Sequence, residues 1–178
     1  PGQAARLARD LHVFPEFIGN RSPFADPDSR AIVAGLDLDA DIGSMEKLFV
    51  AGLCGLAYGL ADVVDAFRAH GIDSDLMVIA GGAGRSALVR QIMADTTGLS
   101  VAVPETQEPV LLGGAMLGAV AGGRYASIGE AMAAMSAIGC LSEPTAPAIS
   151  GFHRTKRRIH ELMRRLDRDS REAMREVD

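Results

Sequence analysis

The segment VIAGGAGRSALVR, residues 78–90, holds the residues of this sequence that are best suited to binding a ligand. Three of the four residues from position 81 to position 84 are glycines, and they lie between an apolar run and a stretch with helical periodicity. A turn of this kind presents free backbone N–H groups and the positive end of a helix dipole, and both attract anions. The segment therefore predicts a turn that binds phosphate or lets a ligand approach the backbone closely.

The spacing of this turn also fits a dinucleotide. Gly82, Gly84 and Ala87 satisfy the GxGxxG/A fingerprint of NAD-binding folds, and Glu105 follows at the end of the next predicted strand. Against NAD, a long apolar helix precedes the turn, and we predict no third strand after it to complete a βαβαβ unit. A P-loop is excluded because the chain contains no GxxxxGK followed by Ser or Thr. The alternative is that the turn binds no ligand and its glycines only permit a tight turn and close helix packing.

Other residues with reactive side chains form no obvious site. The four histidines are scattered, with no cysteine or carboxylate at a useful spacing, so we expect neither a catalytic nor a metal role for His12, His70, His153 and His160. The two cysteines lie in apolar stretches and are not spaced as a redox or metal pair. Cys54 and Cys140 are therefore predicted to be buried thiols of a reducing compartment, the cytoplasm.

Length and charge limit the partners. A chain of 178 residues is long enough for one domain, and its net charge of −5 argues against nucleic acid as a general partner. The basic stretch 153–171 interleaves acidic and basic residues four apart, which predicts a solvated, self-paired helix face with Glu161 next to Arg165 and Asp167 next to Arg171. The apolar run 48–64 is too broken by glycines for a membrane span, and the chain opens with no signal peptide. Because it does not begin with Met, we expect a piece of a longer protein.

Alternating short strands and helices must position the glycine turn. Residues 75–80 and 99–104 have the profile of buried strands, and residues 85–98 between them have that of a helix, which predicts a parallel βαβ unit. Before this unit, the periodicity predicts a core helix over 44–69 with Ser44 as its N-cap and small residues that let another backbone come close.

The rest of the chain is predicted to be mainly helical. Helices are expected over 108–123, which is dense in Gly and Ala, and over 127–138, where Ser127 and Glu130 have capping-box spacing. A proline-rich connection follows, and residues 151–177 form a charged helix with its apolar stripe at Ile159, Leu162, Met163 and Leu166. Helical spacing also places four methionines in the core, namely Met132, Met135, Met163 and Met174.

Three stretches, residues 10–38, 76–105 and 111–132, are similar in order and content to the C-terminal half of the FGGY family of carbohydrate kinases. This family belongs to the actin-like, ribonuclease H-like ATPases. The resemblance implies an α/β fold with a mixed sheet and packed helices, in which residues 1–178 form one domain with a lead-in over 1–10 and a C-terminal helix over 151–178. The sequence GNRSP, followed by Asp and a Gly-Leu loop, resembles the ribulokinase and ribitol-kinase branch, which phosphorylates pentuloses and related polyols.

The resemblance also implies where ATP and Mg²⁺ would bind. Gly81, Gly82 and Ala83 match the family loop that packs against adenosine, and Ser86 matches a position that contacts adenine. The loop Gly35–Leu36–Asp37 matches the segment near the ATP phosphates. Asp37 departs from the Thr or Ser of many members, and its carboxylate would repel a triphosphate unless Mg²⁺ intervened, so a backbone contact at Gly35 is favoured over a side-chain contact from Asp37.

In this family the catalytic base and the first phosphate-binding turn belong to the N-terminal domain, so we expect no catalytic residue in this chain and no activity from it alone. Its expected partners are its own N-terminal kinase domain, a pentulose or pentitol substrate and, in a homodimer, a second copy of the chain. The alternative functions are a non-catalytic NAD-binding module and a regulatory ATPase-like domain. Arg21 and Arg30 would either meet a phosphate or the other domain, or pair with Asp26 or Asp28 in a solvated loop.

Overall fold

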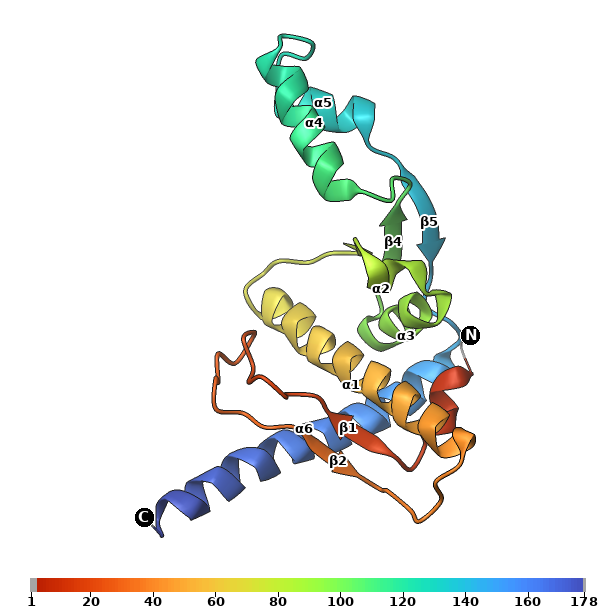
Figure 1. The fold of residues 1–178 in the computed structure, drawn as a ribbon, viewed down its shortest axis with the longest axis vertical. Helices are drawn as coiled ribbons and strands as arrows, with labels where there is room; N and C mark the ends of the chain where they lie inside the picture. Colours follow the sequence, from red (N-terminus) through yellow and green to blue (C-terminus); the bar gives the residue numbers. More distant parts are fainter. Residues whose placement is uncertain (1–2, 178) are drawn as a thin grey trace.

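The computed structural model describes residues 3–177, which form helices around two small sheets (Figure 1). In chain order the elements are the 3₁₀ helix η1 (Ala4–Ala8), β1 (His12–Phe14), β2 (Ile32–Ala34), α1 (Ile42–Ala69), β3 (Leu76–Val78), α2 (Gly82–Arg85), α3 (Ala87–Thr97), β4 (Ser100–Pro104), α4 (Pro109–Ala121), α5 (Ile128–Met135), β5 (Ile138–Ser142) and α6 (Pro147–Arg175).

The sheets confirm the predicted βαβ unit, although β3 is largely exposed rather than buried, and they contain one strand that was not predicted. β3 and β4 are parallel, with Leu76 opposite Ser100, and the helical segment between them is the predicted crossover. β5 pairs antiparallel with the other edge of β4, whereas the sequence predicted helix up to residue 138 and no third strand. Gly139 explains the difference, because a Cβ there would lie 2.8 Å from Cα of Glu105, so only glycine lets β5 come this close. β1 and β2 form a separate antiparallel pair.

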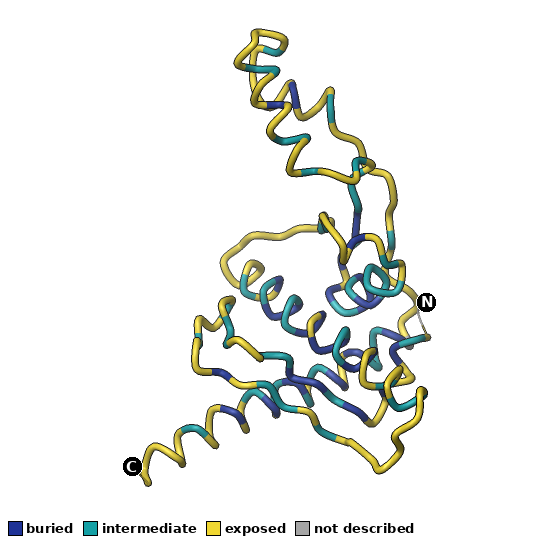
Figure 2. The backbone as a smooth tube through the Cα atoms, viewed as in Figure 1, coloured by how far each residue is buried: buried dark blue, intermediate teal, exposed yellow. Residues whose placement is uncertain are grey.

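Helix α1 is the centre of the core, as predicted. It packs against β1, η1 and α3 (Figure 2), and its buried side chains include Val50, Ala51, Cys54, Ala57 and Tyr58. α1 is also long and apolar enough to cross a membrane by length and composition alone, but its packing is that of a core helix. Its N-cap is Asp41 rather than the predicted Ser44: the Asp41 carboxylate accepts a hydrogen bond of 2.8 Å from the Ser44 N–H.

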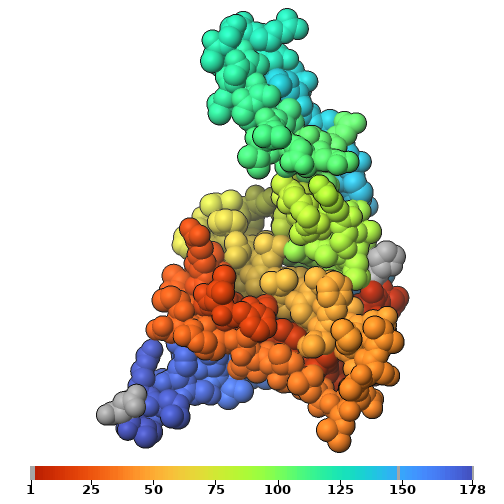
Figure 3. Space-filling model, viewed as in Figure 1, coloured from red at the N-terminus to blue at the C-terminus, as the bar shows by residue number. Residues whose placement is uncertain are grey.

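Helices α4 and α5 form an arm that projects from the sheet and stands clear of the rest of the molecule (Figure 3). The two helices pack on each other, and Met116 is the buried residue of α4. The Ser127 hydroxyl accepts a hydrogen bond from the Glu130 N–H, which confirms the predicted cap of α5. The prediction that Met132 lies in the core is wrong, because Met132 is 52% exposed. Cys140 on β5 is exposed too, whereas Cys54 is buried as predicted.

Helix α6 begins at residue 147, four residues before the predicted start, and it buries a different face. The predicted stripe is wrong at Leu162 and Leu166, which are 59% and 56% exposed, and is confirmed at Met163, which is buried. The buried positions instead follow helical spacing through Ile149, His153, Lys156, His160, Met163 and Asp167. Most of these are polar, so the solvated face predicted for 153–171 is only partly correct. The predicted Asp167–Arg171 pair is confirmed at 3.0 Å, and Met174 is exposed rather than in the core.

Candidate nucleotide site

The glycine turn follows β3 and has a backbone conformation that requires glycine. Gly81 has φ 84° and ψ −162°, a region that other residues essentially never adopt. The next four residues form the short helix α2, and Ser86 then begins α3. The predicted helix over 85–98 is thus confirmed as α3, although it begins at residue 87 because the backbone is extended at Ser86.

The outer surface of this turn is open. Gly81, Gly82 and Ala83 are exposed, and a Cβ added at either glycine would meet no atom within 4 Å. Gly84 is buried on the inner side, where a Cβ would lie 3.0 Å from the carbonyl oxygen of Ile79. The turn therefore packs against the sheet through Gly84 and leaves a flat backbone surface free for a ligand through Gly81–Ala83.

Ser86 lies beside this surface but has a structural task as well. Its hydroxyl oxygen accepts a hydrogen bond of 3.3 Å from the Val89 N–H and so caps α3. A hydroxyl that accepts one hydrogen bond can still donate its own hydrogen. Ser86 can thus cap the helix and donate a hydrogen bond to a ligand at the same time.

Gly35 and Asp37, the other predicted site residues, lie in the loop between β2 and α1. Gly35 has φ 90°, and a Cβ there would collide with the carbonyl oxygen of Asp10. Both residues line a pocket of about 150 Å³ together with Asp10, Asp39 and Lys47. Of the four charged side chains that line it, three are acidic, which disfavours a bare phosphate there. This pocket contains no residue of the glycine turn, and Figure 1 shows the two segments well apart. The structure does not bring the two parts of the predicted site together.

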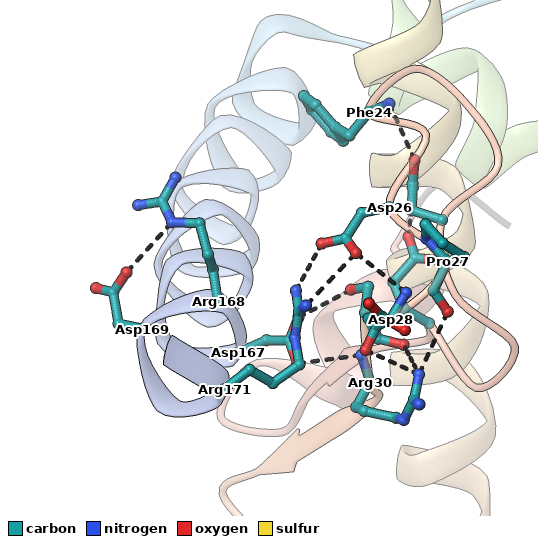
Figure 4. A network of polar contacts seen from close by, with 12 residues as sticks. Phe24, Asp26, Pro27, Asp28, Arg30, Asp167, Arg168, Asp169 and Arg171 are labelled. Carbon is teal, nitrogen blue, oxygen red and sulfur yellow. Dashed lines mark hydrogen bonds and ion pairs between the residues drawn. The ribbon is translucent and has the colours of Figure 1, made fainter. Parts of the chain in front are cut away.

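The loop 19–30 is held by α6 through an acidic and basic network (Figure 4). Asp26 pairs with Arg171 at 2.5 Å, and Asp167 accepts hydrogen bonds from the Ser29 hydroxyl and the Arg30 N–H. The hydrogen bond from Arg171 lowers the pKa of Asp26. Arg30 does not pair with a carboxylate, as one interpretation predicted, but donates to the backbone carbonyls of residues 27–29. The sequence analysis did not predict this network because Asp26 and Arg171 are far apart in the chain.

Buried polar groups lie where α6 packs against α1 and the N-terminal segment. The Tyr58 hydroxyl lies 3.1 Å from Nδ1 of His153, and burial lowers the pKa of His153 and of His160 to about 4. Lys156 is also buried, and its ammonium group donates to the carbonyls of Ala8 and Leu11. These groups are neutral or fully hydrogen-bonded at pH 7 and hold α6 in place. Among residues 3–177 we find no group of three His, Cys, Asp or Glu side chains placed to hold a metal ion.

Comparison with known proteins agrees with this architecture. Residues 2–122 match the FGGY family of carbohydrate kinases, C-terminal domain. The chain is 39% identical over 151 residues to an FGGY carbohydrate kinase domain-containing protein of Danio rerio, covering 85% of this chain and 28% of that protein. It is 29% identical over 116 residues to the D-ribulokinase YDR109C of Saccharomyces cerevisiae, covering 65% of this chain and 16% of that protein.

The structure superposes on the glycerol kinase of Plasmodium falciparum, solved with ADP, with a TM-score of 0.70 and 19% identity; the match covers 92% of this chain and 33% of that one. The fold is thus that of the actin-like ATPases, with a mixed sheet and packed helices. The chain spans about a quarter of the length of the first curated relatives it matches. With a family match over two thirds of its length and a fold shared with solved sugar kinases, the chain belongs to the FGGY family of carbohydrate kinases, as part of its C-terminal domain.

Proposed function

We propose that this chain is the nucleotide-binding part of an ATP-dependent carbohydrate kinase. The observation that carries the proposal is the open backbone surface of Gly81, Gly82 and Ala83, where no side chain keeps a flat ligand away. Adenosine needs such a surface, because a Cβ would hold the purine off the backbone. The ADP in the related glycerol kinase structure supports the choice of an adenine nucleotide.

Mg²⁺ is proposed to arrive with ATP rather than to sit in a protein cage. The carboxylates of Asp10, Asp37 and Asp39 beside Gly35 would repel a bare phosphate, and no three such side chains among residues 3–177 are placed to hold a metal ion, so the cation would come with the nucleotide. Bound Mg²⁺ would neutralise charge on the phosphates during phosphoryl transfer. In the full-length kinase a backbone contact from Gly35 to the phosphates is proposed in preference to a side-chain contact from Asp37.

The proposed acceptor is a pentulose or pentitol. The similarity to the yeast D-ribulokinase and the GNRSP sequence of the loop 19–30 support this class. The catalytic base is assigned to the N-terminal domain of the full-length kinase, so the 178-residue chain alone is proposed to be inactive. A cytoplasmic location is proposed because the substrates of such kinases are metabolites of that compartment.

The remaining part of the kinase is the proposed occupant of an apolar groove between β1, β2 and α1. The groove has a volume of about 570 Å³ and is lined by Val13, Phe17, Val33, Phe49 and Leu56, among others. Phe17 and Phe49 are 70% and 63% exposed, which is unusual for aromatic residues unless another surface covers them. The relatives are about three times as long as this chain, and the additional chain is the source of a covering surface.

NAD binding is the second candidate, and one observation weakens it. The fingerprint residues Gly82, Gly84 and Ala87 do form a strand–turn–helix unit, as a dinucleotide site requires. The third strand, β5, is antiparallel to β4, however, whereas a dinucleotide-binding half is built from parallel strands. The actin-like fold of the chain also favours ATP over NAD.

Steady-state kinetics of the full-length protein test the proposal. We expect ATP-dependent phosphorylation of D-ribulose, D-xylulose or ribitol in preference to glycerol, and no phosphorylation by the 178-residue chain. Gly82→Val should raise the KM for ATP by at least about tenfold and leave the KM for the sugar nearly unchanged, because its side chain would occupy the adenosine surface. Activity in the isolated chain would overturn the assignment of the base, and an unchanged ATP KM would overturn the site.

A further inference from the structure

We propose that Arg90 is a positioning residue that holds the glycine turn in its ligand-binding shape. Arg90 lies in the first turns of α3, and its Nη1 donates a hydrogen bond of 2.6 Å to the carbonyl oxygen of Gly84. Its Nε donates to the Ser142 hydroxyl at 3.3 Å. One guanidinium therefore connects the turn to the end of β5. The inference rests on the proposed function, because it concerns the same nucleotide site.

The Gly84 carbonyl needs a partner from outside its own helix. α2 has only four residues, so the carbonyls in its last turn have no N–H group of the same helix to accept a hydrogen bond from. The Ala83 carbonyl accepts from the Ser86 N–H, and the Gly84 carbonyl accepts from Arg90. A buried carbonyl without a partner is unfavourable, and a hydrogen bond from a charged donor is among the stronger ones. Arg90 thus fixes the end of a helix whose beginning is the open surface of Gly81–Ala83.

Two further contacts along α3 run in parallel with that of Arg90. Gln91 donates to the carbonyl of Glu143 at 2.9 Å. The Asp95 carboxylate accepts from both the N–H and the hydroxyl of Thr145, at 2.6 and 2.7 Å. α3 is therefore joined to the 142–145 segment at three points, and Arg90 is the contact that extends to the turn. A displacement of the β5–α6 connection would therefore move Arg90 and, through it, the glycine turn.

Arg90 also brings positive charge to the back of the turn. Its hydrogen-bond acceptors are a carbonyl and a hydroxyl, and no ion pair to Arg90 is present in the described part of the chain. Its charge is therefore not cancelled by a carboxylate in direct contact. A positive group behind a surface that would hold ATP favours the anionic ligand.

Substitution at both ends of the contact in the full-length kinase tests the inference. Arg90→Met keeps the apolar stem but removes the donors, and we expect the KM for ATP to rise about tenfold while the KM for the sugar changes less than twofold. Arg90→Lys keeps one charged donor but cannot reach both acceptors, so a rise of about threefold is expected. Ser142→Ala removes the weaker contact and should raise the ATP KM about twofold. Arg158→Met is the matched control, because Arg158 is exposed on α6, and the KM for ATP should not change.

Three outcomes decide the matter. A selective rise in the ATP KM for Arg90→Met, with partial rescue by Arg90→Lys, supports the positioning role. An equal rise in the KM values for ATP and for the sugar, together with a lower Tm, would show a general structural role and overturn the positioning role. An unchanged ATP KM in Arg90→Met overturns the inference alone if Gly82→Val still raises that KM, whereas an unchanged value in both variants overturns the proposed nucleotide site itself.

Discussion

Helices α1 and α4 have similar compositions but opposite surroundings. Both are apolar and rich in Gly and Ala, yet a Cβ added at Gly55 of α1 would collide with the carbonyl oxygen of Val13, whereas one added at Gly113, Gly114 or Gly118 of α4 would meet no atom within 4 Å. α4 also exposes Val110, Leu111 and Leu117. A helix that is apolar on every face is normally buried. The comparison shows that Gly55 of α1 serves close packing within this chain, and we infer that the small residues of α4 serve packing against the rest of the kinase.

The largest expected effect lies at Gly55. Gly55→Ala places a methyl group against the Val13 backbone, and we expect the free energy of unfolding to fall by about 3 kcal/mol, since neither backbone can give way easily. Gly59→Ala is the matched control in the same helix, because a Cβ there is unobstructed, and it should raise stability by about 0.5–1 kcal/mol. Urea unfolding of the two variants measures both values. Equal effects would show that α1 is not closely packed at Gly55.

The next effect is a pH dependence that belongs to the region around α1 and α6. His153 and His160 are buried, and their pKa values of about 4 lie below the ordinary value of 6.5. Unfolded chains therefore bind protons that the folded chain excludes, so stability is complete above pH 6.5 and declines as the pH falls toward 4. We expect each of the two histidines to contribute about 2 kcal/mol to this loss between pH 7 and pH 4.5 in urea unfolding.

The histidines and the carboxylates affect the free energy of unfolding in different pH ranges. The pKa of Asp26 and that of Asp41 are lowered from 3.8, so these groups act on stability only at still lower pH. A free energy of unfolding that stays constant from pH 6.5 to 4.5 would contradict the buried, neutral state of both histidines.

The smallest effect tests the arm. Gly114→Ala should change the stability of the 178-residue chain by less than about 0.5 kcal/mol, or increase it slightly, because the position is open and alanine favours helix. In the full-length kinase the same substitution should lower the Tm by a few degrees if another backbone packs against α4. The same small change in both proteins would contradict the inference that α4 is covered.

Local sequence signals predicted the elements that depend on neighbours in the chain. The glycine turn, the parallel β3–α3–β4 unit and the Ser127 cap of α5 were all predicted from spacing, turn residues and capping chemistry. β5 was missed because it exists only through its pairing with β4, which Gly139 makes possible. No local pattern distinguishes such a strand from the end of the preceding helix.

The buried face of α6 was missed for a related reason. Hydrophobic periodicity selected Leu162 and Leu166, but the face that packs inward carries His153, Lys156 and Asp167. Burial of these groups is favourable only because distant segments supply hydrogen-bond partners, such as the carbonyl of Leu11 for Lys156 and the Ser29 hydroxyl for Asp167. For the candidate site the limit is similar: the turn residues were evident in the sequence, whereas the support that Arg90 gives to Gly84 is visible only in three dimensions.

Isothermal titration calorimetry of the full-length protein with ATP and with NAD tests the central claim most directly. We expect ATP with Mg²⁺ to bind, NAD not to bind or compete, and Gly82→Val to weaken ATP binding at least about tenfold without lowering the Tm, since a side chain at Gly82 meets no protein atom. NAD binding that Gly82→Val abolishes, or ATP binding that Gly82→Val leaves unchanged, would contradict the assignment of this turn as the adenosine-binding surface of a sugar kinase.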